Sequence, residues 1–266
     1  MTPDPPGSTE YDREELRQVL RERVGGFFTN TRHLPGQTCT VCAGPATGEL
    51  CRACRTARQA FGAQLADRVL TLAYVQARAH PRHQSEYTMW TYKQRPPITR
   101  SVENLSLMVL AATVLHGDCI ARAAGWPWSA VTFVPSTHHP VERHPLTELA
   151  RQVRPSRPDQ RFLLDLGPSA HNKARTVLPD RFTVPERYRP LVKGAHVLIL
   201  DDTWVSGSNA QSATLAIRAA GADQVTVLCI GRWCPTDRPE CRTLLAATAT
   251  PYDPTVCPLG EDACLQ

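Results

Sequence analysis

The sequence predicts an α/β protein, with a parallel sheet covered by helices on both faces and a small cysteine-rich module near the N-terminus. Between residues 102 and 231, short apolar runs typical of strands alternate with helical patterns, as in doubly covered parallel sheets. One such run, residues 196–200, leads directly into two adjacent aspartates and a turn of small residues. Ahead of the alternating region, four cysteines stand in two close pairs.

Size and composition narrow the class of protein. A chain of 266 residues has room for one ordinary α/β domain with smaller attachments, and 42% hydrophobic residues indicate a globular protein. The net charge of +5 is compatible with phosphate ligands or nucleic acid and is diagnostic of neither. No run approaches the roughly 20 apolar residues of a membrane span, and no signal peptide is evident. We therefore predict a cytoplasmic protein whose ten cysteines are thiols or metal ligands.

The first 36 residues are predicted to comprise a disordered start and one amphipathic helix. Residues 1–9 contain three prolines and a glycine, a composition that disfavours regular structure. In residues 10–24, the apolar side chains recur at helical spacing, at Leu16, Val19, Leu20 and Val24.

Residues 37–58 are predicted to form a zinc module. Cys39 and Cys42 form one C-x2-C pair, and Cys51 and Cys54 form a second after eight intervening residues. Each pair directs two thiolates to one centre, and the Gly- and Pro-containing link lets the pairs face each other. Protein ligands fill all four positions, so the predicted Zn²⁺ is structural.

Two other interpretations of the cysteine pairs stay open. A single C-x2-C pair is also a redox motif, although two copies so close together favour metal binding. A nucleic-acid-binding ribbon is the second alternative, because three arginines cluster around and just beyond the second pair: Arg52, Arg55 and Arg58. Such a cluster is otherwise a solvated helix face.

Residues 59–100 are predicted to connect the module to the main domain, which spans residues 101–233. Residues 65–79 contain the strand-like segment RVLTLAYVQA, and residues 87–93 read YTMWTYK before a Pro-Pro break. A long helix then covers residues 102–124, and its nearly all-round apolar middle predicts burial against a sheet.

The rest of the main domain alternates between the two patterns. Expected strands cover residues 130–135, 161–166 and 224–231, and a helix covers residues 146–153. Residues 167–190 have no periodicity, and a basic loop of this length is usually functional or mobile; its basic side chains include His171, Lys173, Arg175 and Arg181.

The stretch from residue 196 to 222 has the features of a site for a phosphorylated sugar. A buried strand, residues 196–200, leads to Asp201 and Asp202, then to the turn Ser206-Gly207-Ser208 and a helix that opens near residue 209 and stops at Gly221. Backbone N–H groups of such a turn can cradle a phosphate. The carboxylates repel phosphate and suit sugar hydroxyls or a magnesium-bound group. An aspartate-capped turn without a ligand is the alternative.

This stretch resembles the phosphoribosyl pyrophosphate (PRPP) loop of type I phosphoribosyltransferases. The resemblance implies that Asp201 and Asp202 hold the ribose hydroxyls and that the turn holds the 5′-phosphate. Three residues depart from the usual pattern, because Val205 and Asn209 replace hydroxyl residues and Trp204 is bulkier than usual. The implied PRPP-binding residues are Asp201, Asp202, Thr203, Val205, Ser206, Gly207, Ser208 and Asn209, with Lys173 and Arg175.

The order of motifs over residues 39–233 resembles the ComF family of phosphoribosyltransferase-like proteins, named for bacterial competence. In that resemblance Tyr92-Lys93 matches a recurrent Tyr-Lys motif, and Glu142-Arg143-His144 matches the pyrophosphate loop. Residues 172–182 match a flexible loop that closes over the site. His144, followed by proline, replaces the expected glycine of the pyrophosphate loop.

The implied chemistry is displacement of pyrophosphate from C1 of PRPP by a nitrogen nucleophile. Mg²⁺ and basic side chains would neutralise the leaving group, with Arg143 and either Lys173 or Arg175 as the candidates. The implied catalytic residues are Asp201, Asp202 and Arg143, and no residue is assigned as a general base. The acceptor, the turnover and the oligomeric state stay open.

Other functions remain as alternatives. One is a non-catalytic PRPP or nucleotide sensor, or a DNA-uptake accessory that contacts single-stranded DNA or the competence machinery. Another is a nucleic-acid-binding zinc protein with the α/β domain as a scaffold.

Residues 234–266 form a cysteine-containing extension with Cys234, Cys241, Cys257 and Cys264. Reduced thiols are the default prediction for these cysteines, and a second zinc site is the alternative. Cys229 is predicted to pack in the core.

Overall fold

The computed structural model describes residues 13–137, 144–155 and 157–260. Its main sheet has the strand order β1-β2-β7-β6-β3, in which β1 pairs antiparallel and the other four strands are parallel. A separate ladder pairs β4 with β5. The strands are β1 (Thr29–Asn30), β2 (Arg68–Ala77), β3 (Ala130–Phe133), β4 (Asp165–Leu166), β5 (Phe182–Thr183), β6 (His196–Trp204) and β7 (Gln224–Pro235).

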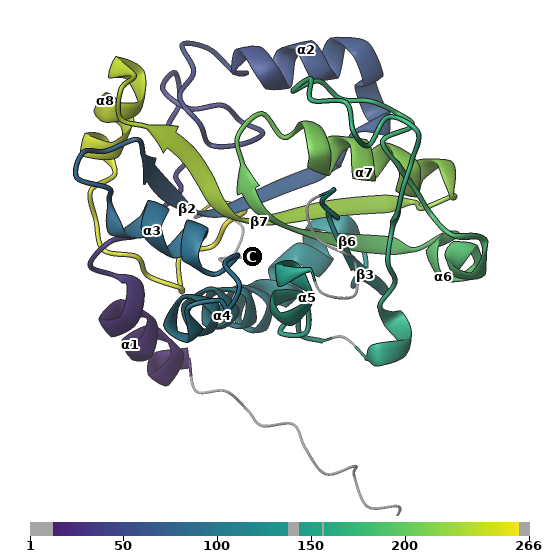
Figure 1. Cartoon of the computed structure of the whole chain (residues 1–266), viewed down its shortest axis with the longest axis horizontal. Coiled ribbons are helices and arrows are strands. Elements are labelled where there is room, and N and C mark those ends of the chain that lie inside the picture. Colours follow the sequence, from purple (N-terminus) through teal and green to yellow (C-terminus); the bar gives the residue numbers. More distant parts are fainter. Residues whose placement is uncertain (1–12, 138–143, 156, 261–266) are drawn as a thin grey trace, which may run out of the picture.

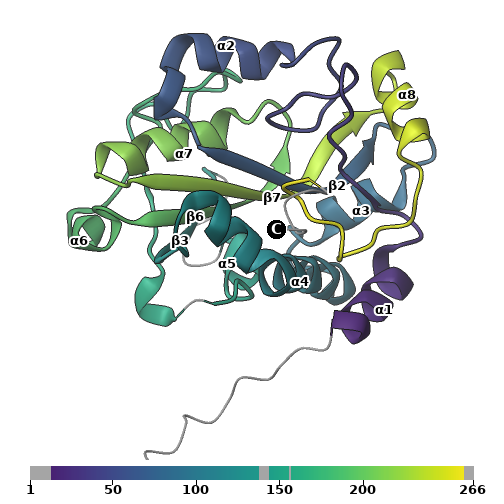
Figure 2. The same ribbon diagram turned by 180° about the vertical axis from the view of Figure 1, so that it is seen from behind.

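Helices cover both faces of the main sheet. Figures 1 and 2 show α2 and α7 on one side, with α4 and α5 on the other. Short 3₁₀ turns and the small helix α6 connect these layers. The helices are α1 (Arg13–Val24), α2 (Arg52–Phe61), α3 (Gln84–Thr91), α4 (Thr99–Ala124), α5 (Pro145–Ala150), α6 (Arg189–Val192), α7 (Ser208–Ala219) and α8 (Pro239–Ala247). The predicted α/β class, with a mostly parallel sheet, is confirmed.

Strand alternation divides the core into two layers. Leu198 and Leu200 of β6 belong to the apolar layer that includes α1, α4 and α5. Val197 and Ile199 face the other way and join the layer that includes α7. Because successive side chains of a strand point to opposite faces, an all-apolar run such as this one needs cover on both sides.

Helix α4 supplies the largest part of one layer. Its side chains are buried along most of its length, as expected for the helix predicted over residues 102–124. Among the described residues it is also the one helix long and apolar enough to cross a membrane by length and composition. The sequence-based statement that no run approaches a span was therefore too strict. Of its most apolar window, however, 67% is buried in the fold, as in a core helix of a soluble protein.

Three expectations about strands need correction. Residues 161–166 do not form a strand of the main sheet: Arg161 makes only an isolated bridge to Val131 of β3, and Asp165 and Leu166 form strand β4 outside that sheet. The strand-like segment of the connecting region, β2, lies inside the main sheet and pairs with β7. Strand β6 runs to Trp204 rather than ending at Leu200, because β7 continues to pair with it up to Arg232, opposite Trp204. The acidic pair is therefore part of the ladder.

The turn after β6 depends on Gly207. This residue has φ of +75°, a left-handed conformation, and it caps the N-terminus of α7. A Cβ atom on Gly207 would come within 2.1 Å of the Trp204 ring, which is 1% exposed. Glycine thus serves both the backbone geometry and the packing of the bulky tryptophan that distinguishes this turn.

Candidate functional site

Asp201 and Asp202 lie in the carboxyl half of β6, alongside β7 and just beyond the last β3–β6 pair, Phe133 and Leu200. Each is only 8% exposed, which is rare for a carboxylate without a partner. The Asp202 backbone N–H donates to the Asp201 carboxylate at 2.9 Å. The pair thus lies in the carboxyl half of the strand, where α/β proteins commonly bind ligands.

The Tyr92-Lys93 motif lies directly against this pair. The Tyr92 hydroxyl donates to Asp202 Oδ2 at 2.6 Å, and the Lys93 ammonium forms an ion pair with the same oxygen. The motif follows α3, which packs beside β2. The Lys93 side chain is 40% exposed and that of Asp202 is 12% exposed. The sequence motif singled out Lys93 but assigned it no role, and the fold shows that Asp202 is its partner.

Contacts with Lys93 and Tyr92 separate the pKa values of the two buried aspartates. Burial, and then the charge of Asp202, raise the pKa of Asp201 well above its ordinary value. Burial alone would also raise the pKa of Asp202, but Lys93 and the Tyr92 hydrogen bond outweigh it and hold that pKa below its usual range. The ionised form of Asp202 is thus stabilised, and Asp201 is the more easily protonated member of the pair.

The turn beyond the pair is built from small polar residues. The Ser206 hydroxyl donates to the Ser208 hydroxyl at 3.2 Å, and Val205 is 41% exposed. Helix α7 then begins at Ser208, within one residue of the predicted start. The first N–H groups of a helix have no partner inside the helix, so this turn offers donors to an anion.

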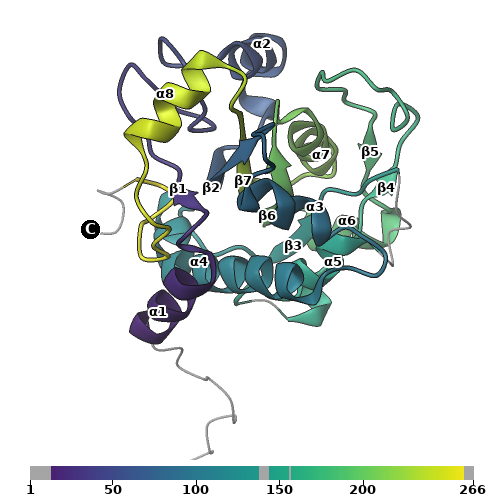
Figure 3. The ribbon, with the colours of Figure 1, turned by 60° about the vertical axis from the view of Figure 1, so that its left-hand side comes forward.

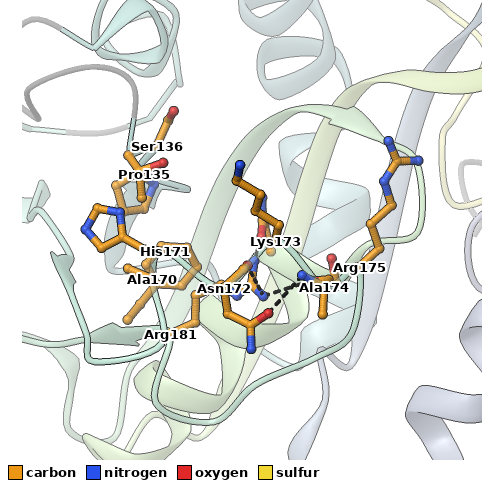
Figure 4. Close-up of a pocket in the computed structure, with 13 residues that line it drawn as sticks. Pro135, Ser136, Ala170, His171, Asn172, Lys173, Ala174, Arg175 and Arg181 are labelled. Carbon is orange, nitrogen blue, oxygen red and sulfur yellow. Dashed lines mark hydrogen bonds between the residues drawn. The ribbon is translucent and has the colours of Figure 1, made fainter.

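A cavity of about 530 Å³ opens beside this turn. Figure 4 shows Lys173 and Arg175 extending to the same side of their loop. The residues that line the cavity are Pro135, Ser136, Thr137, Ala170, His171, Asn172, Lys173, Ala174, Arg175, Arg181, Phe182, Ser208 and Asn209. The predicted residues Lys173, Arg175, Ser208 and Asn209 are thus brought together. Asp201 and Asp202 are not among the described lining residues, and Arg143 lies outside the described residues.

Arg181 fixes the basic loop to the start of α7. Its guanidinium donates to the Asn209 side-chain oxygen at 2.7 Å and to the backbone carbonyls of Asn172 and Ala174 at 3.3 and 3.1 Å. Burial lowers the pKa of Arg181, which is 6% exposed. Because the Asn209 oxygen accepts from Arg181, its amide group can donate elsewhere. The sequence indicated only that Arg181 was one basic residue of the loop.

The four predicted zinc ligands form a cluster. The Sγ atoms of Cys39, Cys42, Cys51 and Cys54 all lie within 4.8 Å of one another, and three of these residues are buried. Such a set of sulfurs fits a tetrahedral Zn²⁺ ion held by protein ligands alone. The arginines around the second cysteine pair, Arg52, Arg55 and Arg58 of α2, are exposed. The clustering of the two pairs is therefore confirmed.

Arg232 joins the cysteine cluster to the acidic strand. Its guanidinium donates to the carbonyl oxygens of Trp204 and Trp233 at 3.1 and 2.7 Å, and a Cβ on Gly44 would overlap it. Burial lowers the pKa of Arg232, but the charges of nearby cysteines, Cys42 first, raise it above its ordinary value overall. A four-thiolate zinc site is a dianion, and this buried cation would offset part of its charge if zinc is bound. No sequence motif pointed to this residue.

The Arg232→Met variant should be among the less stable single variants of the chain. Methionine fills the space but removes the donor to two carbonyls and leaves the thiolates without a counter-charge, which typically costs about 3–5 kcal/mol. Urea denaturation measures the loss. The matched control is Arg189→Met, which removes an exposed ion pair to Glu186 and should change stability by less than about 0.5 kcal/mol. Equal midpoints for the two variants would contradict a bridging role for Arg232.

Comparisons with known proteins show only weak similarity. No protein-family model matches the sequence, and no curated protein matches it. The solved structure of an allosteric regulatory enzyme of purine biosynthesis is 19% identical over 46% of this chain, with a TM-score of 0.26. The chain spans only 26% of that enzyme's length. A phosphoribosyltransferase from Corynebacterium diphtheriae is 16% identical, covering 56% of this chain and 91% of its own, also with a TM-score of 0.26. These scores are too low to support a functional conclusion.

Proposed function

We propose that this chain is a phosphoribosyltransferase-type protein that binds PRPP with Mg²⁺ beside the carboxyl end of β6. One arrangement carries the proposal: the buried acidic pair Asp201–Asp202 precedes a left-handed Gly207 turn and a helix N-terminus that borders a basic cavity. The ComF-type resemblance of the sequence points to the same ligand. In this proposal the four-cysteine module holds a structural Zn²⁺.

The proposed roles follow from charge and position. Asp202, ionised, would accept a ribose hydroxyl, with Asp201 beside it for the second. The turn residues Ser206 and Ser208, with the Asn209 amide, would hold the 5′-phosphate. Bound Mg²⁺ would neutralise the pyrophosphate. Lys173 and Arg175 face the cavity and would contribute further positive charge, and Arg143 is proposed on the sequence alone.

Ligand entry in this proposal requires Lys93 to leave Asp202. Neither aspartate is among the described cavity residues, and Tyr92 and Lys93 both engage Asp202. Because the Lys93 side chain is 40% exposed, its ammonium has room to exchange the carboxylate for a pyrophosphate oxygen. Lys93 would then connect ribose binding to leaving-group binding.

The proposed reaction is nucleophilic substitution at C1 of the ribose. The nitrogen lone pair forms the new C1–N bond, and the C1–O bond to pyrophosphate breaks with its electron pair, so no external oxidant is needed. The nitrogen loses its proton to solvent, since no general base is assigned. Positive charge around the pyrophosphate lowers the barrier because charge develops on the leaving oxygen.

A non-catalytic PRPP or nucleotide sensor is the second candidate. The observation that favours it is Val205, which is 41% exposed at a turn position where a hydroxyl donor would be expected to contact the phosphate. A DNA-uptake or nucleic-acid role would instead use the exposed arginines of α2. The sensor would bind PRPP or a nucleotide, and the nucleic-acid role would bind DNA. Neither would release pyrophosphate.

Calorimetric titration with PRPP, with and without Mg²⁺, tests the proposal. We expect magnesium-dependent binding that weakens in Lys173→Gln and is unchanged in Arg189→Gln, a variant of an exposed arginine. A screen for pyrophosphate release across nucleobases and glutamine then separates a transferase from a sensor. Absence of PRPP binding at millimolar ligand would overturn the proposal.

A limited-proteolysis experiment tests whether residues 171–182 close over the ligand. Trypsin should cut after Lys173 or Arg175 in the free protein, because both residues are exposed. Saturating Mg²⁺–PRPP should slow these cuts, since an ordered backbone resists cleavage. Cleavage after Arg58, exposed on α2, serves as the internal control and should keep its rate. Unchanged rates at Lys173 and Arg175 would remove the loop from the site.

A further inference from the structure

A second cluster of metal-ligating side chains lies on the opposite side of the sheet from the four-cysteine module. His116 and Cys119 come from α4, and Cys257 comes from the segment after α8. Their ligand atoms all lie within 4.8 Å of one another. His116 is 1% exposed, and Cys119 and Cys257 are 6% exposed each. Figure 3 shows the chain after α8 descending along one side of the molecule towards α4.

The positions of the three side chains follow from local geometry. Residues three apart on a helix share a face, so His116 and Cys119 present their ligand atoms to the same side of α4. The arriving segment is held in place by Asn30, whose side chain bonds the Asp253 backbone in both directions, at 2.8 and 2.9 Å. Cys257 follows four residues later and completes the cluster.

A hydrogen bond fixes the tautomer of His116 that could bind a metal. One ring nitrogen, Nε2, lies 2.8 Å from the Pro254 carbonyl oxygen. A carbonyl can only accept, so Nε2 carries the proton and Nδ1 presents a lone pair. Histidine ligands commonly donate their second ring nitrogen to a backbone carbonyl in this way. The Arg122 guanidinium also donates to Cys119 Sγ at 3.6 Å, so a cation lies beside this sulfur.

We propose that His116, Cys119 and Cys257 form a second metal site, with Zn²⁺ as its ion. Two sulfurs and one imidazole nitrogen are ligands that zinc accepts in tetrahedral sites, and magnesium and calcium prefer oxygen. The fourth position would belong to water or to a further ligand. Such an ion would fasten the C-terminal segment to α4, and it is independent of PRPP binding.

Zinc content per chain tests this proposal directly. The full chain, expressed with zinc and purified under reducing conditions, should carry about two ions, one for each cluster. Cys257→Ala and Cys119→Ala should each carry about one. Cys241→Ala is the matched control, because Cys241 is an equally buried thiol outside both clusters, and it should keep both ions. Circular dichroism and the retained first ion establish that the variants are folded.

Hydrogen exchange supplies a second measurement that does not need a variant. Treating the wild-type chain with a chelator strong enough to remove one ion should speed amide exchange in residues 252–260 while leaving α7 unchanged. A wild-type chain with one ion, or two ions retained in both cysteine variants, would overturn the second site. Unchanged exchange in residues 252–260 after loss of the second ion would overturn its fastening role.

Discussion

Replacing Cys42 with serine should remove one zinc ion per chain and destabilise the N-terminal module by several kcal/mol. Structural zinc contributes about 10–16 kcal/mol of binding free energy in small modules, and that energy is available only to the folded form. Serine is a poor zinc ligand, so the three remaining thiolates would hold the ion weakly. Metal analysis and thermal unfolding measure the two effects on the same preparation.

The effect should reach beyond the module. Arg232 contacts the cysteine cluster and donates to the carbonyl at Trp204. Thiolates released from zinc take up protons, so loss of the ion removes negative charge beside this guanidinium. We therefore expect faster amide exchange at the turn after β6 in Cys42→Ser. Cys229→Ala, which alters a buried thiol of β7 outside both clusters, controls for loss of a thiol alone. Full zinc content in the Cys42→Ser, Cys51→Ser double variant would contradict the assignment of these ligands.

Asp202→Asn should weaken PRPP binding by roughly 10- to 150-fold while leaving a folded protein. An ionised carboxylate makes charge-assisted hydrogen bonds to ribose hydroxyls, and loss of its charge costs about 1.5–3 kcal/mol. The amide can still accept from Tyr92 but leaves Lys93 without its anionic partner. The Asp201→Asn, Asp202→Asn double variant should bind more weakly still and show no turnover. Isothermal titration measures the change in affinity.

Orthophosphate is the control ligand for these variants. It has no ribose, so it should bind the turn as well as before, or slightly better once a nearby negative charge is gone. If the folded double variant binds PRPP with wild-type affinity, the acidic pair does not bind the ligand and has only a structural role. The phosphoribosyl proposal would then fail, and the two cysteine clusters would remain as the better functional clue.

Asp201→Asn alone should stabilise the protein at neutral pH. The pKa of Asp201 is raised above the ordinary 3.8 in the folded state. Between these two values the folded chain binds more protons than the unfolded chain, so stability falls as pH rises through the window. Asparagine has no carboxyl group to ionise, so the variant avoids this loss of stability. Its gain in melting temperature over wild type should therefore grow as pH rises above about 4. A constant difference across that range would contradict the raised pKa.

Local sequence patterns were sufficient for several parts of the molecule. The C-x2-C spacing predicted the cysteine cluster, because two residues between ligands fix their relative positions within a single turn. The apolar run of residues 102–124 predicted α4, and the small-residue turn predicted the start of α7. The loop closure over residues 172–182 and the role of Arg143 stay predictions.

The errors arose where pairing between distant segments decides the structure. Residues 161–166 have a strand-like composition, yet they make only one isolated bridge to the edge strand β3, at Arg161, and two of them pair with β5 instead. Strand β6 extends past its apolar run because β7 supplies hydrogen-bonding partners up to Trp204. Whether an ambiguous segment becomes a strand depends on its neighbours, which local periodicity does not contain.

By itself, the sequence determined the fold class, the four cysteines at one centre and the acidic pair beside a small-residue turn, because each is encoded by residues close together in the chain. Only the tertiary structure decided which groups surround them. Lys93 meets Asp202 across 109 positions, Arg232 reaches the cysteine cluster from β7, and Cys257 meets His116 on α4. Packing the helices onto the sheet creates these contacts, and the charge balance of each site depends on them.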